Sequence, residues 1–153
     1  MDLRITLPLD NGFLRRECPH CRRQFKWHDG PTEARPADAP EPPFYYCPYC
    51  GDPAPTDEWW TDAQLEYAEQ AVAGPALREV EEELRTVTKK ASTNFIKLSV
   101  KDIAVPPPPD PLVEAGDMTV VESPCHPWEP VKVADDWEEA LHCLLCGERF
   151  SVG

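Results

Sequence analysis

The sequence predicts an α+β protein in which two small β-rich modules are connected by an amphipathic helical segment. Short runs that alternate apolar and polar residues flank paired cysteines near both ends of the chain, and apolar residues recur every three or four positions between them. The 19 prolines among 153 residues and the mean hydropathy of −0.51 argue against one large apolar core. Modules of this size seldom fold on apolar burial alone, so we expect a further stabilising element in each.

The first module is expected to cover residues 1–58. A turn at residues 10–12 should lead into a strand over 13–17, and Phe25 and Trp27 alternate with polar residues as on a return strand. The proline-rich residues 29–43 read as an irregular insertion. The aromatic run at 44–46 should then form another strand.

A helical connector is expected over residues 59–104. Thr61 and Gln64 fit a capping box, so the helix should begin near Asp62, and Gly74-Pro75 should divide it into two helices. The second helix carries an apolar stripe that packs either on this protein's own strands or on a partner helix; it consists of Leu77, Val80, Leu84, Val87 and Ala91. Residues 96–105 either continue this helix or form a short strand.

A proline-rich linker over residues 105–117 should be extended and lead into a second module over 118–153. Strands are expected at 118–122 and 131–133, on either side of Cys125-His126. Phe150 follows Cys146 at the spacing by which Phe25 follows the earlier Cys21, which indicates a weak internal repeat.

Two Cys-x-x-Cys pairs in the first module predict a closed tetrahedral metal site formed by Cys18, Cys21, Cys47 and Cys50. Zinc is the expected ion, and iron is the chemical alternative because both metals accept four thiolates.

The second module offers Cys125, Cys143 and Cys146, and a histidine should complete the set. His126 is favoured because it lies in the half of the site that otherwise has one ligand, and His142 is the competitor. A second zinc ion per chain is therefore expected, although three buried thiols without metal would also fit this pattern.

These motifs resemble the zinc-ribbon superfamily, in which Cys-x-x-Cys-Gly turns lie at the tips of β-hairpins. The resemblance rests on Cys47–Gly51 and Cys143–Gly147 and extends over residues 13–51 and 118–152. It implies a rubredoxin-like zinc knuckle in each module and a scaffold rather than a particular reaction.

Redox catalysis is a remote alternative, because Cys-Pro-His-Cys and Cys-Pro-Tyr-Cys look like active-site sequences of the glutaredoxin and thiol oxidoreductase families. Those families place the motif at the start of a long helix, which lowers the thiol pKa. Here a strand-like run follows Cys21, and a turn-rich segment follows Cys50. We therefore expect no enzymatic activity.

The net charge of −13 disfavours general binding to nucleic acid. A basic set near the first Cys pair keeps nucleic-acid binding as the second hypothesis; it comprises Arg15, Arg16, Arg22, Arg23 and Lys26. The first hypothesis is an acidic, zinc-binding adaptor with a protein partner.

The reduced cysteines expected at a metal site favour a cytoplasmic protein, with a secreted disulfide scaffold as the alternative. The sequence shows neither a typical signal peptide nor a run that approaches the roughly 18 apolar residues of a membrane span.

Overall fold

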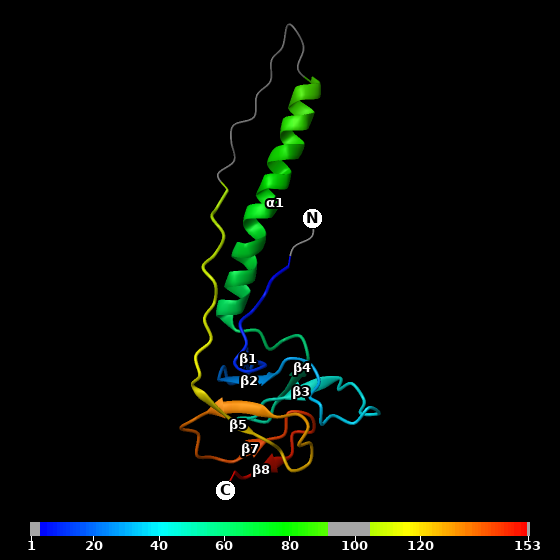
Figure 1. Cartoon of the computed structure of the whole chain (residues 1–153), viewed down its shortest axis with the longest axis vertical. Helices are drawn as coiled ribbons and strands as arrows, with labels where there is room; N and C mark the ends of the chain where they lie inside the picture. The colour runs from blue at the N-terminus through cyan, green and yellow to red at the C-terminus, as the bar shows by residue number, and fades with distance from the viewer. Residues whose placement is uncertain (1–3, 92–104, 153) are drawn as a thin grey trace. The chain divides into compact units, whose positions relative to one another are not determined.

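The computed structural model describes residues 4–91 and 105–152. The chain divides into two compact units, of which the β-rich unit comprises Leu7–Asp62 and Val113–Gly153. The other unit contains the helix α1 (Asp62–Ala91) from Ala63 onward. Figure 1 shows the strands and α1, the one helix among the described residues. Helix and small antiparallel sheets together make an α+β protein, as expected.

A four-stranded antiparallel sheet with the order β1-β2-β6-β5 forms the centre of the β-rich unit. Its strands are β1 (Phe13–Glu17), β2 (Gln24–His28), β5 (Met118–Val121) and β6 (Val131–Ala134). All four lie within one residue of their predicted positions. Each β-rich segment thus supplies one hairpin to a common sheet.

Pairing between β2 and β6 joins the two hairpins, with Lys26 opposite Lys132 and Trp27 opposite Val131. The predicted boundaries between the modules and their connector stay a prediction. The structure adds that the two β-rich segments form one compact unit, because β2 and β6 pair edge to edge.

Two smaller hairpins carry the remaining Cys-x-x-Cys turns. One pairs β3 (Phe44–Tyr46) with β4 (Pro53–Pro55), and the other pairs β7 (Leu141–His142) with β8 (Arg149–Phe150).

Aromatic side chains fill the core between these hairpins. Phe25 and Trp59 are fully buried, and their rings meet edge to face with centroids 5.7 Å apart. The Tyr49 hydroxyl donates to the Gln24 carbonyl oxygen at 2.7 Å and accepts from the Ala134 N–H at 3.0 Å. Tyr49 therefore connects the turn after β3 to both central strands.

The two opposed lysines of the sheet are both buried, and a common carboxylate lies between them. The ammonium groups of Lys26 and Lys132 lie 2.8 and 2.9 Å from Asp10 Oδ2. Lys26 also contacts Glu114 at 3.0 Å, and Glu114 contacts Arg15 at 2.8 Å. Such a network is needed because buried charge without partners is strongly destabilising.

Helix α1 begins at Asp62 as predicted, but the predicted division at Gly74-Pro75 is wrong, because one helix runs through both residues (Figure 1). A proline within a helix removes one backbone donor and crowds the preceding turn. Strong helix formers on both sides of Pro75, chiefly alanine, leucine, glutamate and arginine, favour continuation across it.

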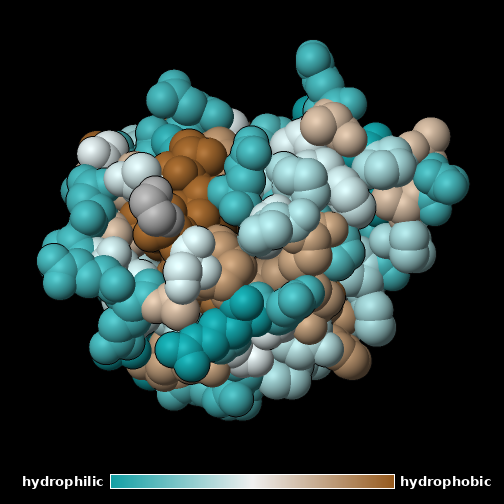
Figure 2. Space-filling model, turned by 90° about the horizontal axis from the view of Figure 1, so that it is seen from below, coloured by the Kyte–Doolittle hydropathy of each residue, from teal (hydrophilic) through white to brown (hydrophobic). Residues whose placement is uncertain are grey.

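The prediction for residues 96–105 lies almost wholly outside the described residues. Within the described ranges, no helix combines the length and the apolar character that a membrane crossing requires. In the view of Figure 2, the most apolar side chains gather in one patch to the upper left, with hydrophilic side chains around it.

Candidate metal centres

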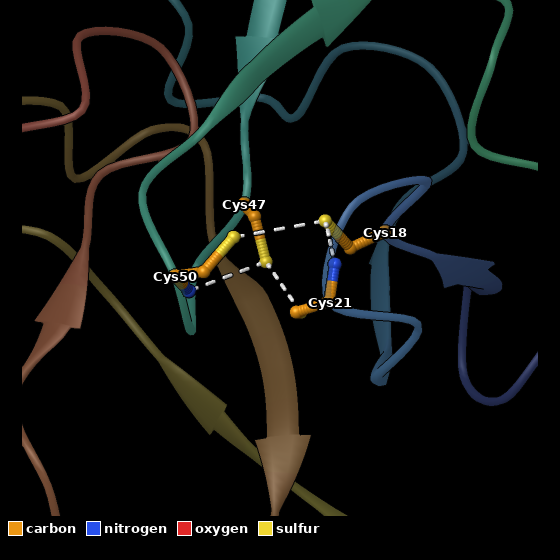
Figure 3. A group of neighbouring side chains, drawn as sticks. All are labelled: Cys18, Cys21, Cys47 and Cys50. Atoms are coloured by element: carbon orange, nitrogen blue, oxygen red, sulfur yellow. Dashed lines mark hydrogen bonds between the residues drawn. The ribbon is translucent and has the colours of Figure 1, made fainter.

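The first group of predicted ligands converges from two hairpins. The sulfur atoms of Cys18, Cys21, Cys47 and Cys50 lie within 4.8 Å of one another, and the four side chains point toward one another (Figure 3). The Cys18–Cys50 and Cys21–Cys47 sulfur pairs are each separated by 3.7 Å. A tetrahedron with metal–sulfur bonds of about 2.3 Å has edges of about 3.8 Å, so this group fits a four-thiolate metal site.

Backbone geometry at the turn between β1 and β2 explains why two thiols on one turn reach the same point. The Cys18 N–H donates to the Arg23 carbonyl at 3.0 Å, and the Arg22 N–H donates to the Cys18 carbonyl at 3.0 Å. Arg22 accordingly has a positive φ of 64°. The N–H groups of His20 and Cys21 point at Cys18 Sγ, at 3.3 and 3.4 Å. This turn therefore directs two N–H dipoles toward the sulfur of Cys18.

The surroundings of these thiols shift their pKa values in different directions. Burial raises the pKa of Cys47, and burial raises the pKa of Cys50 to about 11. Burial also opposes ionisation of Cys18, but the N–H groups of Cys21 and His20 lower its pKa on balance. Four thiolates at such short distances repel one another, so their joint ionisation requires a bound cation.

The second group consists of Cys125, His126, Cys143 and Cys146, whose ligand atoms also lie within 4.8 Å of one another. Cys125 Sγ lies 3.3 Å from Cys146 Sγ, and His126 Nδ1 lies 3.3 Å from Cys143 Sγ. Three sulfurs and one imidazole nitrogen suit a tetrahedral site. Cys143 is buried and Cys146 is exposed, so this group is more open to solvent than the first.

His142, the competing ligand, lies elsewhere. Its ring packs over Gly51, and its Nδ1 is buried without a hydrogen-bond partner among the described residues. Its backbone N–H donates to the Pro48 carbonyl at 2.8 Å. His142 therefore contacts the turn of the first group, whereas His126 joins the second group.

Ser123 contacts the second group, and the sequence did not point to it. Its hydroxyl donates to Cys143 Sγ at 3.1 Å and accepts from the His126 N–H at 3.2 Å. The spacing Ser123-x-x-His126 repeats Cys18-x-x-Cys21, and both follow the first strand of a hairpin. A search for this spacing with serine allowed at the first position could have found it.

The two Cys-x-x-Cys-Gly turns pack against each other reciprocally. The Tyr46 N–H donates to the Leu144 carbonyl, and the His142 N–H donates to the Pro48 carbonyl, both at 2.8 Å. Tyr46 and His142 each precede the first cysteine of their own turn. The second turns of the two ligand groups are thus held together by matching backbone hydrogen bonds.

The predicted basic surface is largely engaged within the protein. Arg15 contacts Asp117 at 2.7 Å, Arg22 contacts Glu17 at 2.7 Å, and Lys26 is fully buried. The remaining two guanidinium groups lie over aromatic rings, with Arg16 over Trp27 and Trp60 and Arg23 over Trp137. Lys26 and Arg16 are therefore buried, whereas Arg22 and Arg23 stay exposed beside their partners.

No helix follows the cysteine pairs of the first group. Strand β2 follows Cys21 at Gln24, and strand β4 follows Cys50 at Pro53. The helix N-terminus that activates a thiol in redox enzymes is therefore missing at both turns.

Comparisons with protein-family models, with curated proteins and with solved structures found no match.

Proposed function

We propose that this chain is a non-enzymatic interaction protein whose β-rich unit is stabilised by two structural zinc ions. The supporting observation is that each ligand group joins two hairpins and offers four donor atoms to one point. A site with four protein ligands has no open position for substrate, which is the usual difference between structural and catalytic zinc.

Zinc is favoured over iron at the second site, because three thiolates with one imidazole is an ordinary structural zinc set. The first site, with four thiolates, accepts either metal by its geometry. Both ions would serve the fold in the same way, because each would fix the relative positions of two short hairpins.

The interaction surface proposed is the exposed apolar stripe of α1. Val80, Leu84 and Val87 follow one another at steps of four and three residues, with 46%, 44% and 63% of their surface exposed. Residues at such steps share one face of a helix and are typical of helix–helix association. Because about half of the surface of these side chains is exposed, association with a partner helix explains the stripe better than packing within the described residues does.

Charges beside the stripe favour a second copy of the chain as the partner. Glutamates lie early in this part of α1, and lysines lie late; they are Glu79, Glu82 and Glu83, then Lys89 and Lys90. Glu81 and Arg85 pair with each other within the helix at 2.7 Å. An antiparallel pair of α1 helices centred near Leu84 brings acidic and basic ends together.

Analytical ultracentrifugation of the zinc-loaded chain and of Leu84→Glu tests this partner. We expect a dimer for the parent chain and a monomer for the variant, with Val113→Glu as the control because Val113 is 92% exposed outside α1. A monomeric parent chain would contradict self-association.

Nucleic-acid binding is the second hypothesis, and the internal partners of the basic residues weigh against it. A mobility-shift measurement at low salt checks this. We expect no shift with duplex DNA or RNA, so Arg22→Glu combined with Arg23→Glu should change nothing. A salt-dependent shift that this double variant abolishes would revive the hypothesis.

A further inference from the structure

A pocket of about 630 Å³ lies in the β-rich unit, between the proline-rich insertion and the segment that carries His126. Thr32 of the insertion donates a hydrogen bond to the Trp128 carbonyl oxygen at 2.6 Å, which connects the two walls. The irregular residues 29–43 thus have a structural role that the sequence did not show, because they line one side of this pocket. Its volume is in the range of sites for small molecules or single side chains.

Three aromatic side chains line the pocket. Trp27 and Tyr45 contact each other with ring centroids 4.7 Å apart, and Trp128 contributes from the opposite segment. All three are only partly buried. The Arg16 guanidinium, 4.5 Å from the Trp27 centroid, covers one face of that ring, so Tyr45, Trp128 and the rest of Trp27 stay open to a ligand. The faces of such rings attract cations through their quadrupole, most strongly for tryptophan.

The charged groups in the pocket leave one negative charge unmatched. The Arg35 guanidinium is engaged by Glu41 at 3.1 Å and by the Ala39 carbonyl at 3.3 Å. The Glu129 carboxylate lines the same pocket and has no hydrogen bond or ion pair among the described residues. Burial raises the pKa of Glu129, and the positive charges of Arg35 and His28 oppose this rise only in part.

We propose that this pocket binds a methylated ammonium group, with Trp27, Tyr45 and Trp128 around the methyl groups and Glu129 supplying the opposite charge. A plain ammonium is compact and strongly hydrated, so it would need several acceptors to replace its water. A quaternary ammonium donates no hydrogen bonds and spreads its charge over its methyl groups, which suits rings and a single carboxylate. The group belongs either to a trimethylated lysine in a peptide or to a choline-type small molecule.

Calorimetric titration of the zinc-loaded full chain tests the proposal with three probes: choline, trimethyllysine amide and 3,3-dimethylbutanol. The last probe has the shape of choline without its charge. We expect saturable binding of at least one cation, about tenfold tighter than the neutral alcohol, since cation–π and charge terms of this kind contribute about 1–2 kcal/mol. Tighter binding of trimethyllysine amide indicates a peptide ligand, and tighter binding of choline indicates a small molecule.

Glu129→Gln should weaken cation binding about fivefold or more and leave any binding of the neutral alcohol unchanged. Glu139→Gln is the matched control, because Glu139 is exposed and does not line the pocket. Trp128→Leu should also weaken binding, and its zinc content should be measured because the Trp128 ring lies against His126. Equal binding of choline and its neutral counterpart, unchanged binding in Glu129→Gln, or no saturable binding of either cation would overturn the proposal.

Discussion

Gly147 lies directly against the ring of Tyr46, so that a Cβ atom at Gly147 would be 2.7 Å from Tyr46 Cδ1. Gly51 has the same relationship to His142, with a distance of 2.8 Å to Cδ2. Both glycines follow the second cysteine of a turn and have positive φ values, 75° at Gly147 and 77° at Gly51. The two cysteine turns are therefore packed so closely that neither position has room for a side chain.

Gly147→Ala should lower the free energy of unfolding by about 2–4 kcal/mol, because backbone strain at positive φ adds to the overlap with Tyr46. Gly30→Ala separates the two effects, since Gly30 has a φ of 85° but no atom within 4 Å of an added Cβ. It should cost about 1 kcal/mol. Urea denaturation of the zinc-loaded proteins provides the comparison. Equal costs for the two variants would show that the close packing on Tyr46 is absent.

Replacement of His126 should lower the metal content, whereas replacement of His142 should leave it unchanged. His126→Ala removes a ligand atom from the second group and should reduce bound zinc from two ions to one. His142→Ala should retain both ions, because the His142 ring packs on Gly51 outside that group. Native mass spectrometry distinguishes the variants. Loss of one ion from His142→Ala but not from His126→Ala would reverse the assignment.

Ser123→Ala should weaken zinc binding at the second site by about 10–100-fold without removing a ligand, as the loss of an outer hydrogen bond to a metal ligand commonly does. The Ser123 hydroxyl donates to Cys143 Sγ and thereby stabilises the thiolate. Competition with a chromophoric chelator measures the change, with the exposed Ser151→Ala as the control. Identical affinities in the two variants would show that this hydrogen bond does not influence the metal.

Lys26→Met and Asp10→Asn should each destabilise the protein, and the double variant should lose less than the sum of the two. Each single change alters the net charge of the buried network, and Asp10→Asn also takes the carboxylate away from Lys132. The double change removes one positive and one negative charge, so the net charge of the network returns to its original value and the two losses should overlap. Urea denaturation of the four proteins at neutral pH gives the coupling. Strict additivity would mean that Lys26 and Asp10 do not interact.

Local patterns in the sequence predicted much of this structure. Alternation at Phe25 and Trp27 gave the strand β2, and the Cys-x-x-Cys spacing brought the first four ligands to one point. These predictions succeeded because strand periodicity and knuckle spacing depend on neighbouring residues.

Contacts between residues that are distant in the sequence could not be predicted from local patterns. Lys26 looked like a surface base on an alternating strand, but β2 pairs with β6 and buries it beside Asp10. Its partners Glu114 and Asp117 come from a segment that is distant in the sequence. The spacing of Ser123 and His126 is visible in the sequence, but serine is not an ordinary zinc ligand, and the contact of Ser123 with Cys143 depends on the fold.

The most direct test of the account is the metal content of the purified chain, measured by native mass spectrometry together with elemental analysis. Two groups of four ligand atoms predict two zinc ions per chain, and removal of both by a chelator should unfold the β-rich unit. A chain that binds no metal, or that keeps its fold and stability after complete removal, would contradict the central claim.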